Sequence, residues 1–182
     1  MSIKEVFKAI TGFFNKNRIK FATIGAFALY SYDYVRATQD IDFLTRDKNK
    51  KQIINFLESL GFETVLSSDA FSNHVHRIGK ARVDIMYVDN QTAAEIFRST
   101  RKRMIFNTLN IPVVSPEHLV ALKLFAIKNN PDRKLRDLAD IKELLQRVNY
   151  DRKKVQQYFK KYKMYNYYNE ILKSTQNENE DI

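Results

Sequence analysis

The sequence predicts an α/β core followed by a region made only of helices. Over residues 1–114, short apolar segments typical of buried strands alternate with segments of helical spacing. From Pro116 onward, the apolar side chains recur only at helical spacing. We therefore expect an α/β domain over residues 1–114, a helical region over residues 115–173 and a frayed polar tail over residues 174–182.

Each element is predicted from its periodicity and from the residues that end it. In the core, helices are predicted for residues 3–17, 26–34, 49–62 and 92–104. Strands are predicted for residues 20–25, 39–45, 62–66, 74–79 and 81–88, and a hairpin-like return for residues 105–115. In the helical region, helices are predicted for residues 116–130, 134–148 and 151–173.

Composition limits the compartment and the kind of partner. The 182 residues include no cysteine, which excludes disulfides and thiolate metal sites. No apolar run is long enough to cross a membrane, so we expect a cytoplasmic protein without a membrane partner. Lys and Arg number 31 against 21 acidic residues, a net charge of +10 that favours a polyanion such as nucleic acid. A general lysine bias of the proteome would give the same balance.

Two aspartates stand two positions apart in the strand-like segment RATQDIDFL. Side chains alternate along a strand, so Asp40 and Asp42 point to one face while Ile41 and Phe43 point to the other. Neighbouring carboxylates repel each other unless a positive charge lies between them, and a divalent metal ion is the simplest one. The alternative is that the two residues cap a turn or pair with surface lysines.

A glycine precedes this pair at a position that suits phosphate binding. Gly25 ends one predicted strand and is followed by a predicted helix, which leads to the strand of Asp40 and Asp42. Glycine lets the backbone approach an anion closely, and the N–H groups at a helix start point toward it. The order strand, glycine, helix and acidic strand therefore predicts a phosphate site beside a metal site.

This arrangement resembles the signature of nucleotidyltransferases of the DNA polymerase β superfamily. Their pattern is a glycine followed by Gly or Ser at a helix start, about a dozen residues, and then Asp-x-Asp. Here Gly25-Ala26 is followed by thirteen residues and then by Asp40-Ile41-Asp42. A third carboxylate on a later strand usually completes the set, and Asp84 in ARVDIMYV fits it. The resemblance implies a mixed, twisted sheet flanked by helices and a C-terminal helical bundle.

The finer pattern R-x-T-x-D-I-D, with Arg36 and Thr38, resembles the small prokaryotic branch that includes the AbiE-type (AbiEii) toxins. A second patch is similar to the helical motifs of that branch, which carry a Lys on one helix and Arg-Asp-x-x-Asp on the next. In this chain the matching residues are Lys123, Arg136, Asp137 and Asp140.

The resemblance implies an enzyme that moves a nucleoside monophosphate from an NTP to an acceptor hydroxyl and releases pyrophosphate. Two Mg²⁺ ions, or Mn²⁺, would be held by Asp40, Asp42 and Asp84, and Asp84 would help to deprotonate the acceptor. Lys123 and Arg36 would neutralise the triphosphate. The expected catalytic residues are Asp40, Asp42, Asp84 and Lys123. The expected nucleotide-binding residues are Gly25, Ala26, Arg36, Thr38, Lys123, Arg136 and Asp137.

The branch and the positive charge together indicate an RNA acceptor, specifically a tRNA 3′ end, and a toxin with a possible cognate antitoxin. One alternative is an enzyme that modifies an antibiotic or another small molecule. Another is an inactive module that binds RNA or protein, because Ala26 lacks the hydroxyl that a serine would offer to a phosphate.

Other polar and aromatic residues have simple structural interpretations. Asp84 could serve only as an ion-pair partner, Lys123 could extend its ammonium to solvent, and Arg136 with Asp137 could form a surface pair. His74 and His76 share a strand face but lack a third nitrogen or sulfur ligand, which argues against a metal site. Five tyrosines could stack on bases, although the seam of a terminal helix is favoured. They are Tyr158, Tyr162, Tyr165, Tyr167 and Tyr168.

Overall fold

A computed structural model describes residues 1–79 and 81–180, with side chains through residue 174. It forms two compact units. The first comprises residues 1–31 and 35–114, and the second comprises residues 32–34 and the chain from residue 115 onward. Within the described residues, no helix is long and apolar enough to span a membrane.

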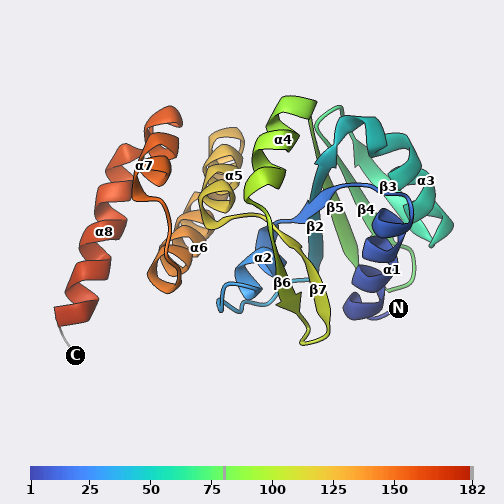
Figure 1. The fold of residues 1–182 in the computed structure, drawn as a ribbon, viewed down its shortest axis with the longest axis horizontal. Coiled ribbons are helices and arrows are strands. Elements are labelled where there is room, and N and C mark those ends of the chain that lie inside the picture. The colour runs from blue at the N-terminus through green and yellow to red at the C-terminus, as the bar shows by residue number, and fades with distance from the viewer. Residues whose placement is uncertain (80, 181–182) are drawn as a thin grey trace. The chain divides into compact units, whose positions relative to one another are not determined.

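The first unit contains a seven-stranded sheet and four α-helices (Figure 1). The helices are α1 (Ile3–Lys16), α2 (Gly25–Tyr30), α3 (Lys50–Ser59) and α4 (Asn90–Ser99), with a short 3-10 helix at Asp47–Asn49. The strands are β1 (Phe21–Thr23), β2 (Asp40–Arg46), β3 (Phe62–Ser67), β4 (Phe71–His76), β5 (Arg82–Val88), β6 (Arg101–Ile105) and β7 (Leu109–Val113).

The sheet has the strand order β3-β4-β5-β2-β1-β7-β6. The pairs β2–β5 and β1–β7 are parallel, whereas all the other neighbours are antiparallel. The mixed sheet with flanking helices, followed by further helices, confirms the predicted fold class.

An aromatic core fixes one face of the sheet. Helices α1 and α3 lie together on this face (Figure 1), where the rings of Phe13 and Phe56 stack 3.9 Å apart. From α1, Phe7 and Phe14 meet Phe43 of β2 edge-on at 5.0 and 5.4 Å between ring centroids. Because side chains alternate along β2, burying Phe43 turns Asp42 to the opposite face.

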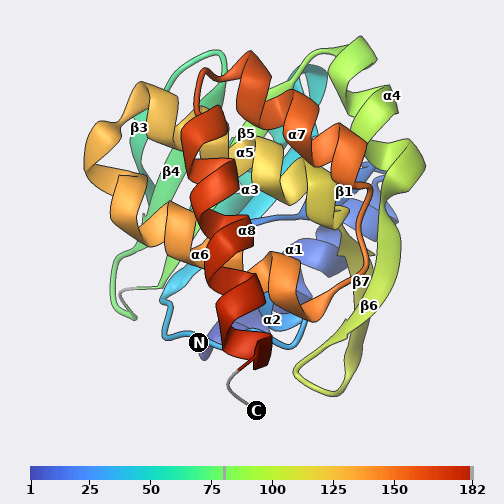
Figure 2. The ribbon, with the colours of Figure 1, turned by 90° about the vertical axis from the view of Figure 1, so that its left-hand side faces the viewer.

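The second unit is a bundle of four α-helices, α5 (Pro116–Asn129), α6 (Lys134–Arg147), α7 (Arg152–Lys161) and α8 (Tyr165–Glu180), with a 3-10 turn at Pro131–Arg133. Helix α5 packs against α6 and α7, and α8 packs against the same two helices (Figure 2). Tyr168 of α8 is fully buried and lies 5.3 Å from Phe159 of α7. For Tyr168, the seam interpretation of the tyrosines is therefore the correct one.

Two predicted helices end earlier than expected. Residues 101–104 were expected in a helix, but they form most of β6. Helix α4 stops at Ser99 because the hydroxyls of Ser99 and Thr100 both donate to the carbonyl of Ile96, which competes with the helical bonds. The helix predicted from residue 26 to 34 also ends early, at Tyr30, and Asp33 has a left-handed φ of 63°.

The predicted helix 151–173 is two helices. Lys163 adopts a left-handed φ of 59°, and the N–H of Met164 donates to the carbonyl of Phe159 at 2.8 Å. This is the bond of a Schellman motif, which ends α7 although no glycine is present. Helix α8 then continues to Glu180, so the prediction of a frayed tail from residue 174 is wrong up to that residue.

A chain of hydrogen bonds crosses three strands on the covered face and is buried at its inner end. The hydroxyl of Thr64 donates to Glu58 at 2.8 Å, so Nδ1 of His74 has to donate to Thr64, 3.1 Å away. The other ring nitrogen then accepts from Ser72, which accepts from the hydroxyl of Tyr87, each over 2.8 Å. With one ring nitrogen donating and the other accepting, His74 is neutral, and burial lowers the pKa of His74 to about 4.

This histidine predicts a loss of stability in acid. Above its ordinary pKa of 6.5, His74 is neutral in both the folded and the unfolded state. As pH falls from 6.5 toward 4, only the unfolded state takes up the proton, so the free energy of unfolding should drop. We expect a loss of roughly 2 kcal/mol, less than the full shift implies because solvent screens part of it. Urea unfolding at pH 7 and pH 4.5 measures it.

His74→Gln removes the titration and should flatten this part of the pH profile. His76→Gln is the matched control, because His76 lies on the same strand but outside the chain of hydrogen bonds. Equal pH dependence in the wild type and in His74→Gln would contradict the prediction.

Candidate active site

Three predicted carboxylates share one face of the sheet. The parallel register of β2 and β5 pairs Asp42 with Asp84, and Asp40 precedes Asp42 by two residues on the same face. All three are half-buried, whereas the intervening Ile41 and Phe43 are fully buried. The fold thus brings together, on neighbouring strands, carboxylates that are more than forty residues apart in sequence.

Gly25 makes room for the carboxylate of Asp42. A Cβ atom at Gly25 would lie 2.0 Å from Oδ2 of Asp42, and Gly25 has a left-handed φ of 64°. The preceding residue fixes this approach, since the N–H of Ile24 donates to the carbonyl of Asp42 at 3.0 Å. The sequence predicted a glycine here for phosphate approach. In the fold, the glycine is required by the aspartate itself.

Asn73 is a site residue that sequence reasoning missed. Its amide donates to Oδ1 of Asp84 at 2.7 Å, and the register of β4 and β5 places the two residues side by side. Asp42, Asp84 and Asn73 therefore form a row across three adjacent strands. The signal in the sequence was an asparagine between two buried strand positions, Ser72 and His74, but only strand pairing shows what it faces.

A hydrogen bond between a side chain and the backbone fixes the segment just before β2. The backbone N–H of Asp40 donates to the hydroxyl of Thr38 at 3.2 Å, which sets the start of the strand. The carboxylate of Asp40 has no hydrogen-bond or ion-pair partner among the described residues. Neither a turn cap nor a pair with a surface lysine therefore explains Asp40.

Two further predicted nucleotide-binding residues are partly or fully covered. Arg36 is half-buried, and Ala26 is only 4% exposed, so its methyl group is packed.

Within the described part of the chain, no three His, Cys, Asp or Glu side chains are grouped as ligands of one metal ion. The donor set nonetheless suits a hard divalent cation, because Asp40, Asp42 and Asp84 offer only carboxylate oxygens on one face. The carboxylate of Asp42 occupies the place that a Cβ atom at Gly25 would take, so the glycine backbone passes directly beside it.

The second unit contains a buried ionic cluster around Lys123. Its ammonium lies 3.1 Å from Asp137 and 2.5 Å from Asp140, and Arg133 reaches the other oxygen of Asp137 at 2.9 Å. Lys123 is 6% exposed, and both aspartates are fully buried. The interpretation of Lys123 as extending to solvent is therefore wrong, as is a surface pair of Arg136 with Asp137.

Arg136, which was predicted beside Asp137, is exposed on α6, and Arg133 takes its place one turn earlier. The spacing of four residues between Arg133 and Asp137 was visible in the sequence and is the usual distance for a helical ion pair. The cluster of Lys123, Arg133, Asp137 and Asp140 has no net charge. Such a neutral arrangement makes the burial of two carboxylates tolerable.

The first unit and the helices after it have the architecture of known nucleotide-transferring enzymes. ANT(2″)-Ia in complex with adenylyl-2″-tobramycin superposes with a TM-score of 0.68 at 13% identity, over 87% of this chain and 95% of that chain. The lincosamide antibiotic adenylyltransferase LnuA, bound to lincomycin, gives 0.59 at 17% identity, over 79% of this chain and 96% of that chain. The fold is that of the DNA polymerase β-like nucleotidyltransferases.

The family is defined by the sequence. The model described as "Nucleotidyl transferase AbiEii toxin, Type IV TA system" matches residues 14–182, so the chain belongs to the AbiEii family. The protein is thus a nucleotidyltransferase. A comparison with functionally curated proteins found no match.

Gly25→Ala tests the close approach to Asp42. The added methyl group would overlap Oδ2 and would also be strained at φ 64°, so the carboxylate has to move. We expect pyrophosphate release from NTPs to fall by about two orders of magnitude, because a displacement of about 1 Å at a reacting centre has that effect. Gly12→Ala, at an exposed position of α1, is the control, since nothing lies within 4 Å of its Cβ. Wild-type activity of Gly25→Ala would exclude the close approach.

Lys123→Met tests the buried cluster. The change leaves Asp137 and Asp140 buried without their shared cation, which should lower the free energy of unfolding by about 3–5 kcal/mol. Lys128→Met is the matched control, because Lys128 is exposed on the same helix and should change stability by less than about 1 kcal/mol. Thermal and urea unfolding measure both variants. Equal stability of the two variants would contradict a structural role for the cluster.

Proposed function

We propose that this protein transfers a nucleoside monophosphate from an NTP to a hydroxyl group of RNA, most specifically a tRNA 3′ end. The acceptor oxygen attacks the α-phosphorus, the bond to the bridging oxygen breaks, and pyrophosphate leaves with that electron pair. The proton of the acceptor hydroxyl goes to the carboxylate of Asp84. The observation that carries the proposal is the row of Asp42 and Asp84 in register, with the backbone of Gly25 in close approach to the carboxylate of Asp42.

In this proposal, Asp40, Asp42 and Asp84 hold divalent cations. When bound, Mg²⁺ or Mn²⁺ supplies charge neutralisation of the triphosphate and lowers the pKa of the attacking hydroxyl. Asn73 orients Asp84 through its amide and so selects which carboxylate oxygen is presented. Thr38 positions Asp40 through the backbone of the strand start.

The other predicted nucleotide-binding residues take different parts. An ammonium has three donors, and Lys123 uses two of them on Asp137 and Asp140, so one remains for a phosphate oxygen. Both oxygens of Asp137 are engaged by Lys123 and Arg133, which supports a positioning role rather than direct nucleotide contact. Arg36 and the exposed Arg136 remain candidates for the triphosphate charge.

RNA is favoured as the acceptor by charge. The surplus of ten positive charges suits a polyanion, whereas a site for a cationic drug gains nothing from it. The family description as the toxin of a type IV toxin–antitoxin system agrees with a cellular target and with a cognate antitoxin as partner. The second candidate is an antibiotic acceptor, which the structural likeness to ANT(2″)-Ia and LnuA favours.

An incubation with each labelled NTP, Mg²⁺ and either total tRNA, an aminoglycoside or a lincosamide separates these acceptors. The expected result is label on tRNA alone. Label on a drug instead would establish the second candidate. Absence of any transfer, together with absence of Mg²⁺-dependent NTP binding in calorimetry, would leave a non-catalytic binding module.

Asp42→Asn is the decisive variant for the site. Asparagine keeps the shape but removes one negative charge, so label transfer should fall by several orders of magnitude while folding is unharmed. The melting temperature should stay the same or rise slightly, because repulsion among Asp40, Asp42 and Asp84 is reduced. Asp69→Asn, at an exposed position between β3 and β4, is the control. A destabilised but active Asp42→Asn protein would end the metal-site proposal.

A further inference from the structure

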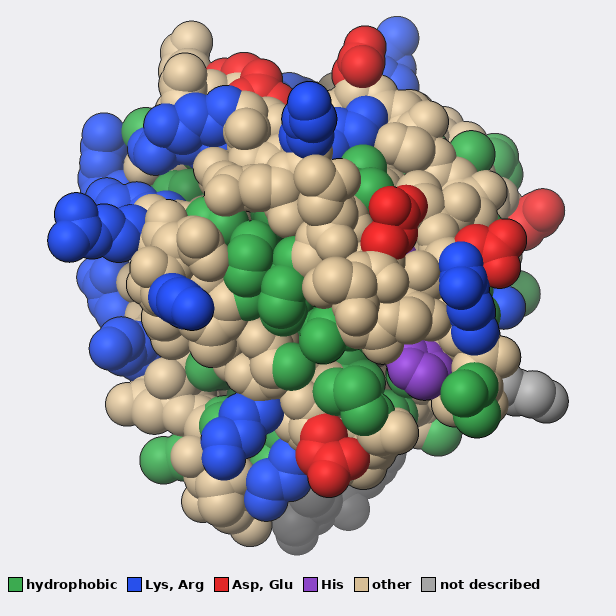
Figure 3. Space-filling model, turned by 90° about the vertical axis from the view of Figure 1, so that its right-hand side faces the viewer, with side chains coloured by type: hydrophobic (Ala, Val, Ile, Leu, Met, Phe, Trp, Pro, Cys, Tyr) green, Lys and Arg blue, Asp and Glu red, His purple; other side chains and the backbone are tan. Residues whose placement is uncertain are grey.

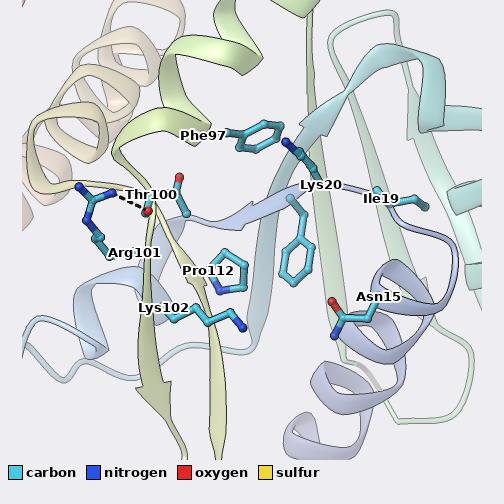
Figure 4. Close-up of a pocket in the computed structure, with 9 residues that line it drawn as sticks. Asn15, Ile19, Lys20, Phe97, Thr100, Arg101, Lys102 and Pro112 are labelled. Atoms are coloured by element: carbon cyan, nitrogen blue, oxygen red, sulfur yellow. Dashed lines mark hydrogen bonds between the residues drawn. The ribbon is translucent and has the colours of Figure 1, made fainter.

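A hollow lies in the first unit, and none of the three carboxylates lines it. It has a volume of about 350 Å³ and lies between the end of α1, strand β1, the end of α4 and the β6–β7 hairpin (Figure 4). Its lining residues are Asn15, Ile19, Lys20, Phe21, Phe97, Thr100, Arg101, Lys102 and Pro112. They come from five helices and strands and two connections, so no short motif could have indicated the hollow.

The lining is positively charged and contains no acidic residue. Lys20 reaches toward Phe97 on one side, and Lys102 extends beside Pro112 on the other (Figure 4). Neither lysine has an ion-pair partner among the described residues. The guanidinium of Arg101 is held at the rim by the carbonyls of Arg98 and Thr100, at 3.2 and 3.1 Å. The hollow therefore offers cations to an anion.

Arg46 adds a fourth cation beside it. The register of β1 and β2 pairs Phe21 with Thr45, and continuing it by one residue sets Lys20 opposite Arg46. Like charges directly opposite each other in a sheet are destabilising unless an anion lies between them. The buried Nε of Arg46 has no hydrogen-bond partner in the described part of the chain. These two cations are thus arranged for a ligand rather than for each other.

Phe97 provides a flat apolar surface at the same place. The ring is half-buried, and the guanidinium of Arg46 lies 5.9 Å from its centroid. A ring flanked by cations at the mouth of a hollow is the combination with which proteins bind single-stranded nucleic acid, because a base stacks on the ring and phosphates meet the cations. The volume suits one nucleotide unit.

Arg46, beside the hollow, shares a strand with two of the carboxylates. Arg46 and Asp42 are on one strand, four residues apart, and alternation puts them on the same face. At about 3.3 Å per residue the separation is roughly 13 Å, which a few nucleotides of extended strand can cover. The edge strand β6 continues the positive surface with exposed Arg101, Lys102 and Arg103. Figure 3 shows Lys and Arg side chains gathered along one margin of the molecule.

Charged residues on an edge strand also prevent pairing with other sheets, and this alone would explain β6. Protection of the edge does not explain Lys20, Arg46 and Phe97, which do not belong to β6.

We propose that the hollow binds one nucleotide of a single-stranded RNA segment, with the base on Phe97 and the flanking phosphates on Lys20, Arg46 and Lys102. This inference rests on the proposed function, because it describes how the RNA acceptor is held outside the reaction centre.

The test measures binding of a fluorescent single-stranded oligoribonucleotide by anisotropy, in the absence of NTP and at several salt concentrations. Lys20→Ala/Lys102→Ala should weaken binding about ten-fold or more and reduce the slope of log Kd against log salt by about 0.7 for each lysine removed. Phe97→Leu should weaken binding between roughly five- and hundred-fold without changing that slope. Melting temperatures establish that the variants are folded.

Lys4→Ala/Lys51→Ala is the matched control, because it removes the same charge from exposed positions on α1 and α3. Equal weakening by both double variants would overturn the site, whereas tRNA labelling would still stand. A competition experiment with AMP distinguishes a nucleotide within RNA from a free nucleotide as the ligand of the hollow. If AMP displaces the RNA at equal nucleotide concentration, the RNA assignment is overturned in favour of a free nucleotide. The wild type could also bind RNA in a way that the variants of the hollow weaken, and yet transfer no label to RNA. That result would uphold the binding site and contradict the proposed function.

Discussion

The parallel pairing of β2 with β5 is the constraint on which the rest of the structure depends. It aligns Asp42 with Asp84, and a slip of one residue would turn one of them to the covered face. The register is held by packing, since Phe43 is enclosed by rings from α1 on the opposite face. The aromatic core of the first unit is therefore what aligns the carboxylates, although it lies on the other side of the sheet.

A close backbone approach completes the arrangement. Gly25 passes so near to Asp42 that any side chain would collide with the carboxylate, and its left-handed conformation suits glycine for the same reason. Asn73 restrains Asp84 from the neighbouring strand. Each carboxylate of the row is thus set by a residue from another element. The family relationship and the fold identify the protein as a nucleotidyltransferase, and this row is the feature of the fold that suits such chemistry.

The basic residues serve two different purposes. Lys123 is buried and balanced by Asp137 and Asp140, so it stabilises the helical unit and contributes no net charge to the surface. Lys20 and Arg46, by contrast, face each other across two strands beside an aromatic ring, without an acidic residue in the lining of the hollow. A net charge of +10 does not distinguish these cases, because only position shows which cations are already paired.

The sequence alone determined the alternation of strands and helices, the spacing from Gly25 to Asp42 and the choice of Asp84, because these depend on local periodicity and on residue type. It did not determine the partners of Lys123, the contact of Asn73 with Asp84, the strand at β6 or the hollow around Phe97. These depend on which strands pair, in which register, and on where a helix stops. Such contacts join residues tens of positions apart, and only tertiary packing decides them.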